Sequence, residues 1–410
     1  MLQQKYVIQY LLPLAMTLLF LCLALSSLTY MPVDFFVYYD AARQAFTTEN
    51  IYAHNIFSER LPDEGLPFVY TPFTLLLIQP FTLLPPMLAW VTWTFVMLCG
   101  LAWALRFLAR SIGHDPSSKF VIALFLLLSG TTVIAQHLAF GQINILLAVA
   151  CLYDLAANKT QRISWLPRGL LTGIAAGIKL TPAFFLFYLL ATRQFRAAIW
   201  MCAGGLGTLA IGAVLFPVNT WHYLSVEILS LSDKVDLGSN FATSGNNSIS
   251  GALAYFWADA PLGVKAFFIL GVAAAALATA YHLHKAQRTL DAVLIVGASI
   301  QLLSPVSWIH HWVFLVFIVL RLSLNARTRR WGLAGLLFLL MQPTDLGDWV
   351  LTALPENIVL SAIGIVFREG LLLLTLALGI VLARPSSSFE ISETGTSSPA
   401  RLPEGQSSER

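Results

Sequence analysis

Long apolar runs separated by short polar connections dominate this chain as far as Arg384. The first run, from Val7 to Leu28, is long enough as a helix to cross the hydrocarbon core of a bilayer, which is about 30 Å thick. No clear small-x-small cleavage site follows it, so we expect an uncleaved transmembrane helix rather than a signal peptide. The whole pattern predicts about 10–12 transmembrane helices.

Two apolar segments interrupt this pattern. Residues 71–84 are short and bounded by prolines, whereas residues 169–190 carry Lys179 and Pro182 after the glycine-rich stretch Gly173–Gly177. Proline removes a helix hydrogen bond, and irregular backbone at membrane depth is tolerated where it lines a cavity. We therefore expect residues 71–84 to be re-entrant or interfacial. Residues 169–190 should form a helix pair that is broken at Lys179–Pro182 and enters and leaves on one side.

The composition supports an all-α integral membrane fold. The 410 residues are 57% hydrophobic and only 11% charged, and the mean hydropathy is +0.74. Soluble domains carry about 25% charged residues, so lipid must surround part of this chain. The net charge of +3, without a basic face, argues against nucleic acid as a partner. The four cysteines show neither metal-ligand spacing nor a disulfide framework, and we interpret them as buried structural thiols.

The distribution of charge gives the expected topology, because cytoplasmic loops retain Lys and Arg. Residues 30–66, residues 217–250 and a turn at Pro343–Trp349 are acidic or polar and should face outward. Residues 1–384 would form one transmembrane domain of a multi-pass plasma-membrane protein, and residues 385–410 a disordered cytosolic tail. The clusters expected in the cytosol are Arg106/Arg110/Lys119, Lys159/Arg162/Arg168, Arg193/Arg196, Lys285/Arg288 and Arg327/Arg329/Arg330.

Asp34 is the first candidate for chemistry. It lies just beyond the first apolar run, in the aromatic sequence Asp-Phe-Phe-Val-Tyr-Tyr. A carboxylate that is partly desolvated by aromatic neighbours has a raised pKa and can act as a general base. The alternative is that Asp34 caps a helix from Phe35 to Ala45 and that the aromatic residues form an interfacial belt.

Two further candidates carry nitrogen groups. His310 and His311 follow Trp308 in an outer turn, where they could orient a carboxylate, hydrogen-bond a phosphate or bind a metal, or simply belong to an interfacial belt. Adjacent histidines on a helix point about 100° apart, so both are not expected to bind one ion. Lys179 is costly in an apolar helix pair unless it faces a cavity or an anion, and its alternative is to snorkel to the cytosolic face.

Two amide-rich turns complete the set. Gln142 and Asn144 lie in a tight outer turn after Gly141, and their amides could bind sugar hydroxyls or phosphate, or join two helices. Asn246 and Asn247 lie in the long outer loop and suit an anion or a sugar, although loops commonly contain such residues. Four of the five features fall in the outer half, which favours one shared site.

The order of these motifs resembles the actinobacterial polyprenol-phosphate-mannose-dependent α-1,2-mannosyltransferases of glycosyltransferase family 87. The resemblance extends from about residue 1 to residue 384 and is carried by six motifs, each weak alone. They are Asp34-x-x-Val-Tyr38-Tyr39, Phe68-Val-Tyr70-x-Pro72, Gly141-Gln142-x-Asn144, Ala176-Gly-Ile-Lys179-Leu-Thr-Pro182, Asn246-Asn247-Ser248 and Ser304-Pro-Val-Ser-Trp308-x-His310-His311.

The resemblance implies a GT-C membrane fold with an extracytoplasmic active site. It implies Asp34 as the general base, assisted by one histidine of His310/His311, and transfer of mannose from polyprenyl-phosphate mannose to a glycolipid acceptor. Lys179 would meet the donor phosphate, and the bent segments 71–84 and 169–190 would border the cavity for the lipid donor. No cofactor or metal is expected. The other residues expected to bind donor or acceptor are Tyr38, Tyr39, Arg43, Tyr70, Gln142, Asn144, Asn246, Asn247 and Trp308.

Three other functions remain open at this point. A related arabinofuranosyltransferase branch shares the early motifs, but the Ser-Trp-x-His-His segment favours mannose. A flippase or transporter for a lipid-linked sugar would also have intramembrane charge, but it would not need Asp34 as a base. A scaffold subunit of a cell-envelope complex would keep the motifs without activity. The acceptor is not specified by the sequence.

Overall fold

Helices dominate the computed structural model, which describes residues 32–115, 117–158, 160–230, 234, 241–341, 343–354 and 357–384. In these ranges the only extended pairing is an isolated bridge between Ile56 and Leu66. The expected helix at residues 7–28 and the expected tail at residues 385–410 lie outside the described residues. The all-helical class is confirmed.

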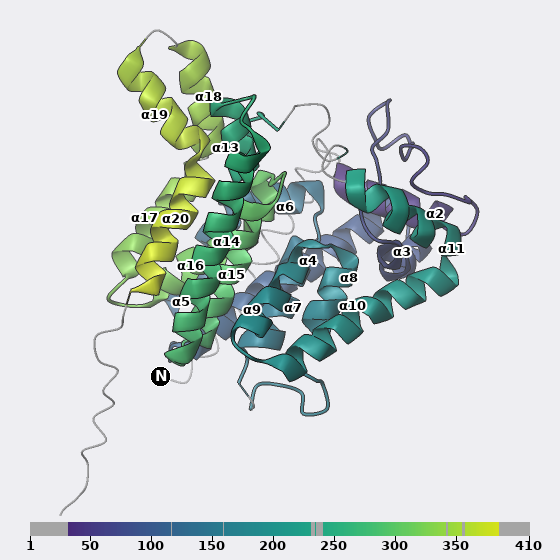
Figure 1. The fold of residues 1–410 in the computed structure, drawn as a ribbon, viewed down its shortest axis with the longest axis horizontal. Coiled ribbons are helices and arrows are strands. Elements are labelled where there is room, and N and C mark those ends of the chain that lie inside the picture. Colours follow the sequence, from purple (N-terminus) through teal and green to yellow (C-terminus); the bar gives the residue numbers. More distant parts are fainter. Residues whose placement is uncertain are drawn as a thin grey trace, which may run out of the picture.

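The first half of the chain forms the right-hand part of Figure 1 and much of its centre. Its helices are α2 (Val33–Gln44), α3 (Pro72–Ile78), η1 (Gln79–Leu83), α4 (Pro86–Ser111), α5 (Lys119–Ser129), α6 (Thr132–Phe140), α7 (Asn144–Ala156), α8 (Leu170–Ile178), η2 (Thr181–Phe184), α9 (Phe185–Ala191), α10 (Phe195–Leu215), α11 (Pro217–His222) and the π-helical turn η3 (Tyr223–Glu227).

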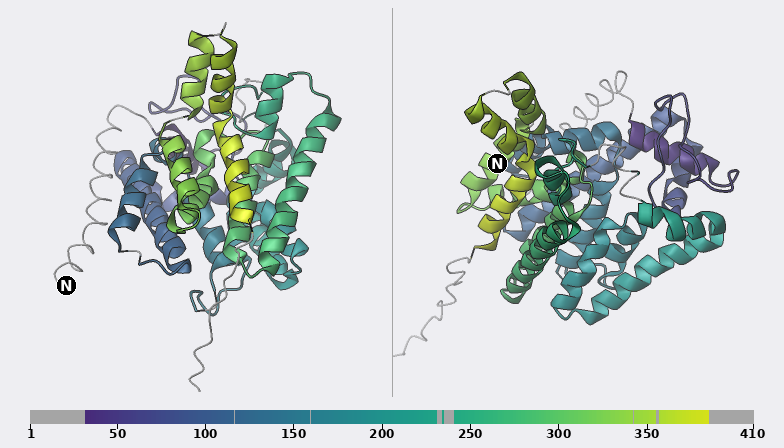
Figure 2. Two further views of the ribbon diagram at one scale, coloured as in Figure 1. Left: turned by 90° about the vertical axis from the view of Figure 1, so that its left-hand side faces the viewer. Right: turned by 45° about the horizontal axis from the view of Figure 1, so that its top comes forward.

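The second half packs beside it, and Figure 2 shows the two parts from other directions. Its helices are α13 (Ile249–Phe256), α14 (Leu262–Lys285), α15 (Thr289–Leu303), η4 (Ile309–His311), α16 (Val313–Leu324), α17 (Arg329–Leu340), α18 (Pro343–Ala353), α19 (Ile358–Arg368) and α20 (Gly370–Ala383). The buried core includes α15 and α16, whose side chains are almost all inaccessible.

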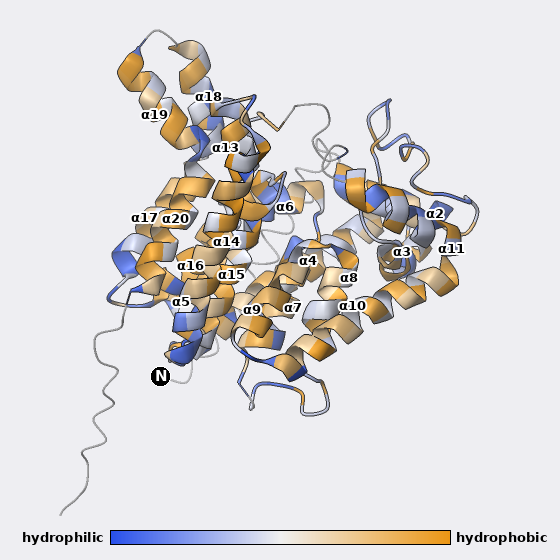
Figure 3. Ribbon diagram, in the orientation of Figure 1, coloured by the Kyte–Doolittle hydropathy of each residue, from blue (hydrophilic) through white to orange (hydrophobic). Residues whose placement is uncertain are grey.

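Among the described residues, three helices are long and apolar enough to cross a membrane alone, namely α4, α10 and α14. The pairs α5–α6 and α19–α20 bend by 62° and 69°, and each pair counts as one more crossing if it is continuous. Only 6% of the apolar window of α14 and 28% of that of α10 are buried, and Figure 3 shows that hydrophobic residues dominate both helices. The membrane character is thus confirmed, whereas the expected number of about 10–12 crossings stays a prediction.

The break at Lys179–Pro182 is present. Helix α8 ends at Ile178, and Lys179 has an extended backbone (φ −138°, ψ 130°). Pro182 has no N–H to continue the ladder, so carbonyls at the end of α8 need other partners. The hydroxyl of Thr74 donates to the carbonyl of Ile178 at 3.1 Å, and Thr71 donates to that of Gly177. The two irregular segments therefore meet each other.

Glycine residues bring α8 unusually close to α10. A Cβ atom on Gly173 would lie 2.0 Å from the carbonyl oxygen of Met201, and one on Gly177 would lie 1.8 Å from the Thr208 hydroxyl. Such small-residue contacts are typical of helix pairs in membranes. This packing fixes the end of α8, and hence the start of the Lys179 break, against a long helix.

Two sequence expectations are wrong. The segment Pro343–Trp349 is not a turn, because it forms most of helix α18; Pro343 is its first residue and Asp345 lies in its first turn, both of which favour a helix start. Cys151 is buried, but Cys99 and Cys202 are exposed on the outer faces of α4 and α10. A thiol is apolar enough for such faces.

Candidate functional site

Asp34 lies in the first turn of α2 and faces the turn between α6 and α7. The N-cap of α2 is Pro32, with no side-chain cap, so the interpretation of Asp34 as a helix cap is wrong. Instead its Oδ2 accepts a hydrogen bond of 2.7 Å from Nε2 of Gln142. Phe35 follows it and packs on Trp93, with ring centroids 5.8 Å apart. Asp34 is thus held by a partner 108 residues away.

The α6–α7 turn is built to present Gln142 to Asp34. Gly141 has φ +74°, and a Cβ atom there would lie 2.5 Å from Cβ of Phe35, so only glycine fits. Its carbonyl accepts a 2.8 Å bond from the Trp93 indole. The backbone N–H of Ile145 donates to Nε2 of His137 at 3.0 Å. These contacts lock the turn on both sides.

Gln142 is the centre of a polar network. Its Oε1 accepts from the hydroxyl of Tyr70 at 3.2 Å and from Nδ2 of Asn144 at 3.3 Å, while its Nε2 donates to Asp34. The hydroxyls of Tyr38 and Tyr70 share a 2.8 Å hydrogen bond. The amide oxygen of Gln142 faces two donors, Tyr70 and Asn144, and its NH₂ group faces an acceptor, Asp34. One orientation of the amide therefore satisfies all three partners.

Lys179 closes the network from the α8 break. Its Nζ donates to Oδ1 of Asn144 at 3.0 Å and approaches Nε2 of His311 at 3.3 Å. It also lies 5.4 Å from the ring centroid of Tyr70, which is within cation–π range. Lys179 thus points into this network of site residues, which contradicts the snorkelling alternative.

The two histidines have different surroundings. His311 faces Lys179, whereas His310 is only 7% exposed and neither of its ring nitrogens has a partner among the described residues. Their rings lie edge to face with centroids 4.6 Å apart. Burial, reinforced by the charge of Lys179, holds the pKa of both imidazoles well below its ordinary value. Neutral imidazoles suit acceptance of a hydrogen bond from Lys179.

The electrostatics of Asp34 fit a base that works near neutral pH. Burial raises its pKa to about 6, although the hydrogen bond from Gln142 and the charge of Lys179 oppose this. A base with a pKa near the working pH combines the correct protonation state with useful proton affinity. Asp34 therefore carries its charge at pH 7 while retaining basicity.

Several expected site residues do not join this network. The hydroxyl of Tyr39 donates to the carbonyl of Leu84, and Arg43 lies exposed at the far end of α2, with its guanidinium 5.9 Å from the Tyr39 ring. Asn246 and Asn247 are fully buried. Their roles toward a substrate stay predictions.

Asn246 and Asn247 instead hold the segment that carries the histidines. Oδ1 of Asn246 accepts from the backbone N–H of Ser307 at 2.9 Å, and its Nδ2 donates to the carbonyl of Pro305. The N–H of Asn247 donates to the carbonyl of Ser307. Trp308, which is partly buried, packs so closely on Gly245 that a Cβ there would lie 2.9 Å from its ring. These residues position the loop before His310.

Sequence reasoning missed His137. It is completely buried, accepts from the first turn of α7, and lies near Lys179 and the histidine pair. Its place four residues before Gly141, in a mostly apolar helix, was the available signal. A cavity of about 30 Å³ borders His311, Asn144 and Thr181, which is room for about one or two water molecules.

Comparison with known proteins gives a consistent relationship. The model of glycosyltransferase family 87 matches residues 68–305, which include Tyr70, Gln142, Asn144 and Lys179 but neither Asp34 nor His310. No solved structure gives a significant match.

Curated relatives extend the match. A polyprenol-phosphate-mannose-dependent alpha-(1-2)-phosphatidylinositol pentamannoside mannosyltransferase of Mycolicibacterium smegmatis is 29% identical over 69% of this chain and 67% of its own length. The protein of the same description from Mycobacterium tuberculosis is 32% identical over 69% of this chain and 64% of its own length.

A third relative, a polyprenol-phosphate-mannose-dependent alpha-(1-2)-phosphatidylinositol mannoside mannosyltransferase of Mycobacterium tuberculosis, is 30% identical over 77% of each chain. The match thus spans about two thirds to three quarters of these relatives. Together, the family match over more than half of the sequence and this third relative show that the chain belongs to glycosyltransferase family 87.

Proposed function

We propose that this protein is a membrane mannosyltransferase of the GT-C type. It would transfer mannose from polyprenyl-phosphate mannose to a hydroxyl of a phosphatidylinositol mannoside or a related lipoglycan, forming an α-1,2 linkage. The printed descriptions of the three relatives support the donor, the sugar and the acceptor class. They also favour mannose over the arabinofuranosyl alternative.

The observation that carries the mechanism is that one turn holds both groups: Gln142 donates to Asp34, and Asn144 accepts from Lys179. In the proposed reaction Asp34 takes the proton of the acceptor hydroxyl, and the oxygen forms a bond to the anomeric carbon. The bond from that carbon to the phosphate oxygen breaks, and polyprenyl phosphate leaves with the electron pair. A single displacement converts a β-linked donor into an α-mannoside.

Lys179 is well placed to stabilise the leaving phosphate. Asn144 and His311 take two of the three ammonium protons, so within the described residues one proton remains for a phosphate oxygen. A fixed cation in a site that excludes water stabilises developing negative charge without reorganisation. Phosphate is already a good leaving group, so one carboxylate suffices, whereas glycoside hydrolases use two.

We also propose that the reaction needs no metal ion. Among the described residues, Asp34 is surrounded by an amide donor and an ammonium group rather than by further carboxylates that would hold a hard cation. Mannose transfer should therefore survive excess EDTA. Restoration of activity only by added Mg²⁺ or Mn²⁺ would contradict this proposal.

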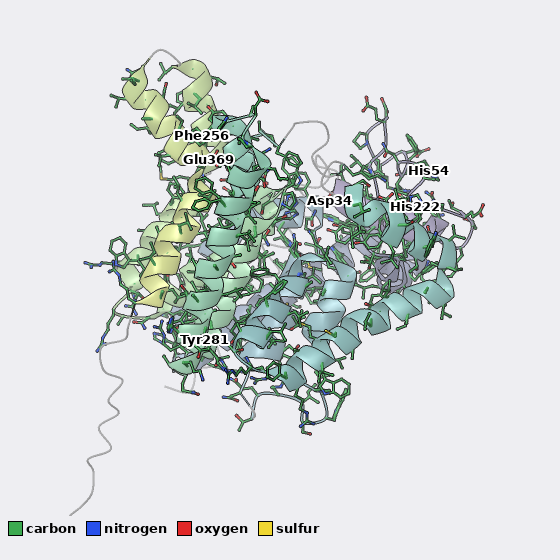
Figure 4. All side chains as sticks on the ribbon, viewed as in Figure 1. Asp34, His54, His222, Phe256, Tyr281 and Glu369 are labelled. Carbon is green, nitrogen blue, oxygen red and sulfur yellow. The ribbon has the colours of Figure 1, made fainter. Side chains whose placement is uncertain are left out.

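The arrangement of charge supports a site on the outer face of the plasma membrane. Asp34 lies in the upper half of Figure 4, whereas Tyr281, one turn before Lys285 at the end of α14, lies well below it. Basic loops are retained in the cytoplasm, which would place there the lower end of α14 and the described end of the chain at Arg384, whose carbonyl accepts from Arg288. Polyprenyl-linked sugars in the outer leaflet would then reach the site by lateral diffusion within that leaflet.

The test is an assay of the purified protein in nanodiscs with polyprenyl-phosphate mannose and a panel of phosphatidylinositol mannosides. Mannose transfer to at least one acceptor, with an α-1,2 linkage by NMR, is the expected result. Transfer of arabinose instead would refute the sugar, and movement of donor across liposomes without any transfer would favour a flippase. Activity without added proteins would exclude a pure scaffold role.

A further inference from the structure

A second group of nitrogen side chains lies at the end of the molecule away from Asp34, where α8, α10 and α15 begin and α9 and α14 end. Tyr281 marks this end in Figure 4, and His284 follows it in the last turn of α14. The segment before α8 adds Arg168, and the turn between α9 and α10 adds Arg193. Helix α9 packs against both α10 and α14. Three segments that are distant in the sequence thus meet here.

Arg168 is partly buried and has no ion pair with any described carboxylate. Its Nη2 donates to the carbonyl of Ala157 at 2.8 Å, which leaves most of its five N–H groups for other acceptors. The charge of Asp154 reaches Arg168, but that carboxylate already accepts from Arg162 and from the backbone N–H of Gly169. Burial and the charge of Arg162 lower the pKa of Arg168. The guanidinium therefore lacks a matched negative charge.

Tyr188 and His284 complete this group. The hydroxyl of Tyr188 lies 3.2 Å from Nδ1 of His284, and the hydroxyl of Thr289 lies 3.4 Å from the same atom. A neutral imidazole that accepts at Nδ1 carries its proton on Nε2, and no described residue forms a hydrogen bond with Nε2. The charge of Arg168 acts on both Tyr188 and His284. The guanidinium and the imidazole thus offer N–H donors to one region.

Exposed apolar side chains border these donors. Tyr188 is only 1% exposed, whereas Phe187 and Leu190 on the same short helix are 55% and 44% exposed. Trp165, which precedes Arg168 in the α7–α8 connection, is 77% exposed, and tryptophan is enriched where a membrane meets water. The donors therefore lie at a boundary between polar groups and a lipid-facing surface, not in a fully solvated loop.

The chemistry of these groups matches the headgroup of an anionic phospholipid. A guanidinium binds phosphate oxygens through several N–H groups at once, and an imidazole N–H adds a further donor. Basic pockets between membrane helices on the cytoplasmic side are known to bind anionic headgroups. A free phosphate would use the donors but not the apolar residues of α9, whereas a phospholipid would use both. A zwitterionic headgroup also carries a cation, which Arg168 would repel.

We propose that Arg168, His284 and Tyr188 form a site for the phosphate of an anionic phospholipid in the cytosolic leaflet, with the acyl chains along Phe187 and Leu190 of α9. The site lies at the opposite end of the molecule from Asp34. It needs the proposed orientation in the membrane but not the proposed transfer of mannose, so a failure of either leaves the other standing.

The probe is dioleoyl phosphatidylglycerol, titrated into the full-length protein in a neutral detergent and followed by native mass spectrometry. Dioleoyl phosphatidylcholine is the zwitterionic comparison, and it should bind at least about tenfold more weakly. Arg168→Gln should weaken the tightest phosphatidylglycerol site about ten- to a hundredfold, because a charge-assisted contact is lost. Arg110→Gln removes a charge from the exposed end of α4 and should leave that site unchanged.

Tyr188→Phe is the second variant, and it keeps the inference testable if Arg168→Gln does not fold. It removes only the hydroxyl that contacts His284, so the affinity for phosphatidylglycerol should fall about two- to tenfold. Thermal unfolding confirms the fold of each variant, and phosphatidylglycerol should raise the unfolding temperature of the unmodified protein more than that of Arg168→Gln.

Three results would overturn the inference. Equal affinities of Arg168→Gln and Arg110→Gln would reduce the effect to a general attraction of lipid by basic loops. Equal binding of phosphatidylcholine and phosphatidylglycerol would remove the need for a negative headgroup. Displacement of phosphatidylglycerol by inorganic phosphate, or equal affinity for glycerophosphoglycerol without acyl chains, would show that the site takes a free phosphate instead of a lipid.

Discussion

Replacement of Gln142 by leucine should move the acid limb of the pH–activity profile, because Gln142 stabilises the ionised form of Asp34. Nε2 of Gln142 donates to Asp34 at 2.7 Å, and this bond keeps the pKa of Asp34 at about 6 against the effect of burial. A hydrogen bond to a charged group contributes about 1.5–3 kcal/mol, and one pKa unit corresponds to about 1.4 kcal/mol. Loss of the bond should therefore raise the pKa by about one to two units.

The sign follows from the role of a base, which must be deprotonated. Activity of the unmodified protein should fall as the pH drops through about 6, and that of Gln142→Leu as it drops through about 7 to 8. At pH 7 the deprotonated fraction would decrease from about 90% to between about 10% and 50%. Turnover should thus drop about two- to tenfold at pH 7 and recover largely near pH 9.

The assay is kcat/KM for mannose transfer from pH 5 to pH 9.5, which reports the ionisation of the free enzyme. Gln194→Leu is the matched control, since Gln194 lies just before α10 and donates to Thr192 instead. Thermal unfolding confirms that each variant is folded. An acid limb that stays in place, or an equal loss of activity at every pH, would show that Gln142 does not act through the charge of Asp34.

Three further substitutions test other contacts. Lys179→Met should raise the KM for the donor about ten- to a hundredfold, because the donor phosphate loses a charge-assisted contact. Lys119→Met, on the exposed start of α5, should leave that KM unchanged, and the same donor KM in both variants would refute the role of Lys179. In chemical unfolding, Gly141→Ala should lower the free energy of unfolding by about 2–4 kcal/mol, because the alanine is strained at positive φ and clashes with Phe35. Gly113→Ala, also at positive φ but in open space, should cost about 1 kcal/mol, and equal losses would show that the contact of Gly141 with Phe35 does not matter. Asn246→Ala should lower the unfolding temperature and weaken activity through loss of the bond to the Ser307 backbone, and an unchanged unfolding temperature would show that this bond does not hold the loop.

The motifs predicted the participants of the site because polar groups are expensive in an apolar chain. Asp34, Gln142, Asn144, Lys179 and His311 are polar residues next to or within apolar segments, so each needed a partner or a substrate. The structure brings all five into one network. Sequence reasoning could not show that Gln142 is the direct partner of Asp34, since 108 residues separate them.

Neighbouring residues of one motif make different contacts, because their side chains point in different directions. Tyr38 and Tyr39 are adjacent, but Tyr38 faces Tyr70 and Tyr39 faces Leu84, because neighbours on a helix point about 100° apart. The amides of Asn246 and Asn247 suited a substrate by composition, yet backbone groups of nearby loops satisfy them. The residue type shows that a side chain can form hydrogen bonds, but it does not show whether the protein or the substrate supplies the partner.

Helix breaks were predictable where proline and glycine determine the backbone. The break at Lys179–Pro182 appeared as expected. Pro343 was expected to lie in a turn, but it is the first residue of helix α18. Proline is common at the first position of helices, so a proline alone does not indicate a turn. The bends of 62° and 69° in α5–α6 and α19–α20 lie beside Gly130 and Gly370. Apolar runs alone do not show whether each bent pair makes one crossing, so the number of crossings stays a prediction.

The most direct test of Asp34 as the base is mannose transfer by Asp34→Asn, measured together with binding of polyprenyl-phosphate mannose. The native state binds the Asp34 proton more tightly than the unfolded chain, since its pKa rises from 3.8 to about 6. Stability from this group is therefore present below about pH 4 and decreases as the pH rises through about 6, by up to about 3 kcal/mol. A neutral asparagine should not destabilise the protein at pH 7.

We expect folded Asp34→Asn to bind the donor with the affinity of the unmodified protein while turnover falls at least about a thousandfold, the upper part of the range for loss of a general base. Transfer within tenfold of the unmodified rate, by a variant that is folded and binds the donor, would contradict the assignment of Asp34 as the catalytic base.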